Sequence, residues 1–117
     1  MEPKRIFAEF YRTASGREPV REFLLELNRD DKKSIGIAIS KLEYRWPQGL
    51  PLCRPLGAGL WEVRVDLTSN RIARVLFGIV SGRMVLVHAF IKKSQKTPRS
   101  DLELGRERLN EVLKHDK

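Results

Sequence analysis

Residues 59–98 have the sequence G-LWEVRVDL-TSNR-IARVLFGI-VSGR-MVLVHAFI-KKSQKTP, and this stretch decides the fold. Two short polar turns separate three apolar runs: Leu60–Leu67, Ile72–Val80 and Met84–Ile91. In the first run apolar and charged residues alternate, as is typical of a strand with one buried face. Connections this short make consecutive strands antiparallel neighbours. We therefore predict a three-strand antiparallel meander, whose last and almost wholly apolar strand is central and covered on both faces.

Two amphipathic helices are predicted before this stretch. The first begins at Pro19, which suits a first helical turn, and its apolar residues follow at helical spacing: Val20, Phe23, Leu24 and Leu27. The second is capped by Asp30 or Asp31 and carries a similar stripe of Ile35, Ile39, Leu42 and Trp46. Two weaker strands are expected over Ile6–Tyr11 and Leu52–Leu56. The helical hairpin needs an apolar surface to cover, which we expect to be the sheet.

A last helix is predicted to open at Pro98. Its N-cap is either Thr97 or Ser100, the latter in a capping box with Glu103. Its apolar stripe is thin, consisting of Leu102, Leu109 and Leu113. Gly105 weakens the helix by roughly 1 kcal/mol relative to alanine. We expect this helix to be more exposed than the first two.

Composition and charge limit the classes of protein to consider. The chain has 117 residues, enough for one domain spanning 1–117, and a formal net charge of +8. Such a basic domain is attracted to polyanions, although a merely soluble surface is the alternative. Cys53 is the only cysteine, which excludes an internal disulfide and a thiolate metal site and favours a packed thiol. The N-terminus has no apolar signal core and no run approaches the roughly 20 residues that span a membrane, so we expect a cytoplasmic protein.

Two arginines lie within the apolar strands of the meander. A buried guanidinium is costly, so the head groups of Arg64 and Arg74 should reach a rim or an anionic partner such as a phosphate. The alternative is a salt bridge with a local carboxylate, Glu62 or Asp66. Arg74 is the more suggestive of the two, because its own strand contains no acid.

Three lysines follow the last strand. Lys92, Lys93 and Lys96 precede a helix N-terminus, where basic side chains and backbone N–H groups can converge on a phosphate. An ordinary solvated loop is the alternative. His88 is a further candidate, since strand alternation would place it with Phe90 and Lys92 on the face of Met84 and Leu86; a satisfied core histidine is the competing interpretation.

The motifs that are absent narrow the chemistry. The chain has no nucleoside-triphosphate loop, no H-E-x-x-H metal motif and no G-x-S-x-G elbow. Neither a metal nor another cofactor is therefore expected. Metal-free cleavage of RNA stays open, because the 2′-OH can act as the internal nucleophile while cationic side chains stabilise the phosphorane. The identity of the general base is left open.

Two segments, RPLGAGLWEVRVDLTSNRIARVLF and VLVHAFIKKSQKTP, together resemble the phage-derived, HigB-like branch of the RelE/ParE toxin superfamily. The pattern of that branch is P-L-x-x-G-L-W-E-L-R, a Y-R-V-like strand, and L-L-H-x-F-x-K-K-x-x-K-T-P. The resemblance runs from about Leu52 to the C-terminus, whereas the helical hairpin fits in order and length only. Ala73 departs from the pattern, because relatives often have an aromatic residue there that can stack on a base.

The resemblance implies a RelE-like α+β fold: a curved, mainly antiparallel sheet against an N-terminal helical hairpin, with a C-terminal helix. It implies a toxin that cleaves mRNA in the ribosomal A site and assembles with a neutralising antitoxin, often a helix-turn-helix protein. Carried over by position, it implies a catalytic group and a group that binds RNA or phosphate. The catalytic group is Arg64, Arg74, Lys92, Lys93 and His88; the binding group is Glu62, Arg71, Lys96 and Arg99.

Two other functions are compatible with the same sequence. One is a non-catalytic module that binds nucleic acid or an antitoxin and cleaves nothing. The other is a ParE-like gyrase poison, which would not need the three lysines.

Overall fold

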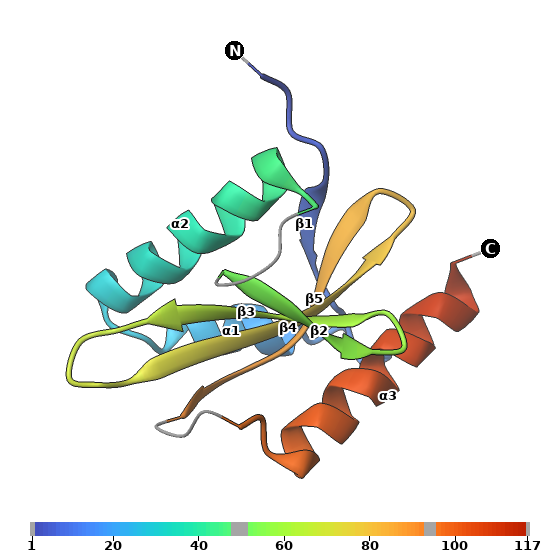
Figure 1. Cartoon of the computed structure of the whole chain (residues 1–117). Helices are drawn as coiled ribbons and strands as arrows, with labels where there is room; N and C mark the ends of the chain where they lie inside the picture. The colour runs from blue at the N-terminus through green and yellow to red at the C-terminus, as the bar shows by residue number, and fades with distance from the viewer. Residues whose placement is uncertain (1, 48–51, 93–95, 117) are drawn as a thin grey trace.

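The computed structural model describes residues 2–47, 52–92 and 96–116. In chain order it contains β1 (Phe7–Phe10), α1 (Pro19–Leu25), α2 (Arg29–Arg45), β2 (Cys53–Gly57), β3 (Leu60–Asp66), β4 (Ile72–Val80), β5 (Arg83–Lys92) and α3 (Arg99–His115). The strands form an open sheet in the order β1-β5-β4-β3-β2, antiparallel except that β1 runs parallel to β5 (Figure 1). The predicted mixed α+β architecture and the three-strand meander are confirmed, and β5 lies inside the sheet. Within the described ranges, none of the helices is both long and apolar enough to cross a membrane.

The helix starts are set by residues other than those predicted. Pro19 does open α1, but α2 is capped by Asn28, whose side chain accepts a hydrogen bond of 2.8 Å from the N–H of Asp31. Asp30 and Asp31 instead lie in the first turn of α2, where negative charge is favourable. The sequence prediction was wrong because three neighbouring residues could each act as the cap.

The start of α3 also differs from the prediction. Pro98 is the N-cap, with an extended backbone and no side-chain cap. Thr97 lies one residue earlier, and its hydroxyl hydrogen-bonds within the sheet. Neither Thr97 nor Ser100 therefore caps this helix.

One face of the sheet, which we call the α2 face, carries the larger core. The helices α1 and α2 cover it, as predicted, and its buried side chains come from these helices, the strands and the segment before β1: Ile6, Val20, Ile35, Leu42, Val63, Val75, Phe77, Met84 and Leu86. Trp46 at the end of α2 meets the ring of Trp61 edge-on, with ring centroids 4.9 Å apart. Burial of this apolar area is the main stabilising contribution on the α2 face.

A β-bulge changes which side chains of β5 share a face. The pairing with β4 passes from Leu76 opposite His88 to Phe77 opposite Leu86, so Val87 has no partner in the register. Because a bulge inserts one residue, the alternation reverses there. His88 does share a face with Phe90 and Lys92, but Met84 and Leu86 lie on the α2 face, contrary to the prediction.

The opposite face, the α3 face, is covered at one end by α3 (Figure 1). Leu109 is buried there against β4 and β5, whereas Leu113 remains exposed and does not extend the stripe as predicted. Gly105 has a packing role, because a Cβ at this position would lie 2.8 Å from the side chain of Leu76. Gly78 on β4 has the same role, because a Cβ there would lie 2.4 Å from the side chain of Leu109. The two glycines let helix and sheet approach closely.

Candidate phosphate-binding site

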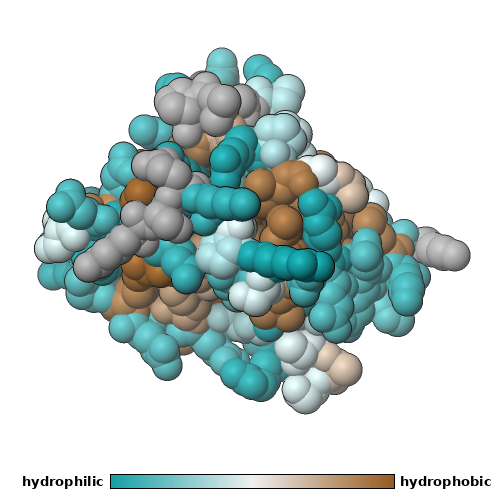
Figure 2. Space-filling view, turned by 60° about the horizontal axis from the view of Figure 1, so that its bottom comes forward, coloured by the Kyte–Doolittle hydropathy of each residue, from teal (hydrophilic) through white to brown (hydrophobic). Residues whose placement is uncertain are grey.

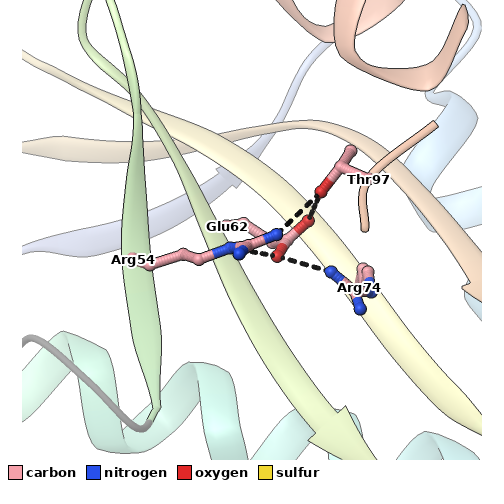
Figure 3. Close-up of polar contacts among 4 residues, drawn as sticks. All are labelled: Arg54, Glu62, Arg74 and Thr97. Carbon is pink, nitrogen blue, oxygen red and sulfur yellow. Dashed lines mark hydrogen bonds and ion pairs between the residues drawn. The ribbon is translucent and has the colours of Figure 1, made fainter. Parts of the chain in front are cut away.

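A cluster of charged side chains occupies the other end of the α3 face, beside α3 (Figure 3). At its centre the carboxylate of Glu62 accepts hydrogen bonds from Arg54 Nε at 3.0 Å, from Arg74 Nη1 at 2.9 Å, and from the Thr97 hydroxyl. Arg54 also donates from Nη2 to the Thr97 hydroxyl oxygen at 3.2 Å. Three adjacent strands and the segment before α3 thus meet at a single carboxylate.

The charges of this cluster do not cancel. Glu62 and Arg74 are each 1 % exposed at the side chain, whereas Arg54 is 40 % exposed. Two guanidinium groups facing one carboxylate leave a net charge of +1. Glu62 therefore satisfies the salt-bridge alternative raised for Arg74, with the acid supplied by the neighbouring strand. In this arrangement Arg74 contributes buried positive charge, and it is Arg54 that extends from the cluster to solvent.

Three of the cationic residues predicted from the sequence lie on the same face as this cluster or next to it in the chain. Arg64 lies opposite Arg74 across the β3–β4 pair and is half-buried. Lys92 lies opposite Ile72 at the end of β5 and is also half-buried, whereas Lys96 is exposed. Lys93 lies outside the described residues. On this side of the molecule hydrophilic side chains cover most of the surface, with apolar residues visible between them (Figure 2).

His88 is joined to the start of α3. Its Nε2 atom lies 2.7 Å from Oδ1 of Asp101, and its ring stacks on Phe90 with centroids 5.5 Å apart. The row Glu62–Leu76–His88 across three strands places the imidazole on the same face as the cluster. Sequence reasoning missed Asp101, because the two residues are 13 positions apart and no local pattern joins them.

Two predicted phosphate ligands lie elsewhere. Arg71 makes a two-pronged ion pair with Asp31 at the start of α2, at 2.7 and 3.1 Å. The hydrogen bonds that Arg71 donates to this carboxylate raise the pKa of Arg71 and keep its side chain on the α2 side of the sheet. Arg99 is 90 % exposed on the first turn of α3, where it pairs with Glu103. The structure therefore brings neither of them into the cluster.

Other reactive side chains are accounted for by packing. Cys53 is 1 % exposed in the core of the α2 face, and burial raises the pKa of its thiol. This agrees with the packed thiol expected from the sequence. Among the described residues, no group of three or more His, Cys, Asp and Glu side chains is placed to hold a metal ion.

Comparisons with known proteins place the chain in a family. No curated protein matches the sequence. A family model described as phage-derived protein Gp49-like (DUF891) matches residues 22–110, which include all of the cluster described above. That family is of the RelE/ParE-like toxin type and is associated with the toxins of toxin–antitoxin systems. Because the match extends over most of its length, the chain belongs to the phage-derived Gp49-like family.

Proposed function

We propose that this protein is the toxin of a toxin–antitoxin pair and a metal-independent endoribonuclease that cleaves mRNA in the ribosomal A site. The observation that carries the proposal is the cationic end of the α3 face. There Arg64 and Lys92 lie on the same face as the Arg54–Glu62–Arg74 cluster, which has a net positive charge, and Lys96 directly precedes Thr97 in the chain. Such a set of donors is best suited to binding the phosphodiester groups of a polyanion such as RNA.

The proposed reaction divides its tasks among these residues. Arg64 and the lysines bind the scissile phosphate and stabilise the negative charge of the phosphorane. Stabilising charge in the transition state is usually the largest contribution that such groups make to the rate. His88 takes part in proton transfer, and the 2′-OH of the preceding nucleotide attacks phosphorus. The products are a 2′,3′-cyclic phosphate and a 5′-OH. Arg74 supports the site through its buried charge and by holding Glu62.

Primer extension on mRNA in a purified translation system tests this proposal. We expect cuts that depend on ribosomes, and about 10- to 100-fold slower cleavage by Arg64→Ala and by Lys92→Ala. Lys41→Ala is the matched control, because it removes the same charge from the exposed outer side of α2 and should cleave at the native rate. Arg64 is a better test position than Arg74, because Arg74→Ala would remove one of the two guanidinium groups that pair with the buried Glu62.

Two results would contradict the proposal. Products with a 5′-phosphate would exclude attack by the 2′-OH. Absence of cleavage by the folded native protein would favour a non-catalytic module or a gyrase poison. Variants of Lys92 and Lys96 that remained toxic would support the gyrase hypothesis.

The family also suggests a partner. We propose that a small helix-turn-helix antitoxin binds this protein in the cytoplasm and forms a hetero-oligomer with it. Co-expression with the product of an adjacent reading frame, followed by purification, should yield a stable complex without ribonuclease activity. Full activity of the purified complex would contradict this assignment.

A further inference from the structure

The contact between His88 and Asp101 joins the central sheet to the first turn of α3. The Nε2–Oδ1 distance of 2.7 Å is that of a strong hydrogen bond. The two side chains are mostly buried, with 15 % and 19 % of their surface exposed. The ring of Phe90 stacks on the imidazole ring, with an angle of 29° between the two ring planes. Two contacts thus fix the position and the orientation of one imidazole.

We propose that Asp101 is a positioning residue that makes Nδ1 of His88 the general base for the 2′-OH. An ionised carboxylate can only accept a hydrogen bond, so the Nε2 atom facing it has to carry the proton. In the neutral ring the lone pair is then on Nδ1. This inference rests on the proposed ribonuclease function and adds to it the residue that orients the base and the nitrogen that receives the proton.

The proton and electron pairs balance in the resulting step. Nδ1 takes the proton of the 2′-OH as the O2′–P bond forms, and the imidazolium is stabilised by the Asp101 carboxylate beside it. The P–O5′ bond then breaks, and the leaving oxygen takes a proton from water. The imidazolium returns its proton to solvent, so the protein ends unchanged and no co-reactant is consumed.

The geometry makes this base depend on the docking of α3. Asp101 belongs to α3, whose position is set by the close approach of Gly105 to Leu76 and by the anchoring of Thr97 on Glu62. Leu76 lies in the register between Glu62 and His88. Glu62 and His88 are therefore about 10 Å apart across two strand spacings, and the buried side chain of Leu76 lies between them under Gly105 of α3.

The tautomer of His88 gives a readout that needs no substrate. His88 and His115 are the only histidines, so the ¹⁵N signals of the two rings are simple to assign. At about pH 8, where an ordinary imidazole is neutral, we expect the Nε2–H tautomer at His88 in the native protein and a mixture of tautomers in Asp101→Ala. Glu103→Gln is the control, since it removes an acid from the same end of α3 without touching His88. An Nδ1–H tautomer in the native protein would overturn the proposal.

Single-turnover cleavage on programmed ribosomes gives the second readout. We expect Asp101→Ala to lower the rate of the chemical step about 10- to 100-fold at unchanged binding, and Asp101→Glu to recover part of it. Native-like cleavage by Asp101→Ala would overturn the positioning role alone and leave the ribonuclease function standing. Absence of cleavage by the native protein would overturn both. A loss of rate with a native tautomer and weaker ribosome binding would show that Asp101 only holds α3, and would also overturn the proposal.

Discussion

The two faces of the sheet are built from the same strands but are closed in different ways. On the α2 face, β3 and β4 contribute Val63, Val75 and Phe77 to a continuous apolar core under the helical hairpin. On the α3 face, the intervening residues are Glu62, Arg74 and Leu76, and Leu76 lies opposite Glu62 and under α3. The core of the α2 face therefore follows from burial of apolar area, and the buried carboxylates of α2, Asp31 and Glu43, pair with Arg71 and Lys4. The α3 face instead buries an ion pair between neighbouring strands, which burial of apolar area would not select.

The two faces therefore contribute differently to the stability of the fold and to its proposed function. A buried ion pair is seldom more stable than the apolar residues that could replace it, because desolvation of the charges offsets their attraction. The contribution of the Glu62 cluster to folding therefore does not explain why it is present. The proposed function does, because the net positive charge of the cluster adds to the charges of Arg64 and Lys92 on the same face. The α2 face provides the rigid support on which that cluster is held.

Breaking the buried ion pair should give the largest change. Glu62→Ala removes the carboxylate that accepts from Nη1 of the buried Arg74, and we expect the free energy of unfolding to fall by about 3–5 kcal/mol. Urea denaturation followed by circular dichroism measures this. The double variant Glu62→Leu with Arg74→Met should regain most of that stability while remaining inactive.

An exposed acid serves as the control for the same measurement. Glu103→Ala, on the first turns of α3, should change stability by no more than about 0.5 kcal/mol. A loss below about 1 kcal/mol in Glu62→Ala would show that the guanidinium of Arg74 can reach solvent. Arg74 would then be available to bind a phosphate directly, as the sequence suggested.

Most helices and strands of the α2 face could be predicted from the sequence, whereas the cap of α2 and the ion pair of Arg71 with Asp31 could not. These helices and strands follow from apolar residues at periods of about 3.6 and 2 residues, which report burial directly. The α3 face was predicted less well, because its features depend on contacts across the fold. The bulge at Val87 reverses the alternation of β5 without any local signal such as a glycine. Asp101 reaches His88 only because α3 folds back over the sheet.

The charged cluster was predicted in part. Sequence reasoning proposed an ion pair of Glu62 with Arg64 or Arg74 as an alternative, and the antiparallel register selects Arg74. The roles of Arg54 and Thr97 were not predicted. Arg54 lies on a strand made uncertain by its flanking prolines, and Thr97 looked like a helix cap. The structure identifies the roles of both residues, because each donates a hydrogen bond to the carboxylate of Glu62.

A pair of glycine substitutions tests how closely α3 approaches the sheet. Gly78→Ala places a methyl group among the side-chain atoms of Leu109, and we expect a loss of about 1–3 kcal/mol in the free energy of unfolding. Gly36→Ala is the matched control on α2, where nothing lies within 4 Å of an added Cβ. Alanine is the better helix former, so this variant should gain about 0.5–1 kcal/mol. Equal gains in both variants would show that α3 packs loosely.

The smallest effect should appear at alkaline pH, where a buried thiol on the α2 face and a buried phenol on the α3 face titrate. Burial raises the pKa of the Cys53 thiol on the α2 face. Burial, and then the hydrogen bond to Glu111, raise the pKa of Tyr11 on the α3 face. The folded state therefore holds each proton more tightly than the unfolded chain does. The stability gained is fully present below the unfolded pKa, about 8.5 for cysteine and 10 for tyrosine, and is lost as pH rises above it.

Urea unfolding at a series of pH values tells the two faces apart. One proton contributes a slope of at most about 1.4 kcal/mol per pH unit, and between about pH 8.5 and 10 that slope should come from Cys53. Cys53→Ala should therefore flatten the profile in this window, whatever its constant loss of packing. Tyr11→Phe should leave the window unchanged and act only above it. A decline that persists in Cys53→Ala would place the titrating group outside the core of the α2 face, and the apolar closure of that face would then not be what holds the thiol neutral.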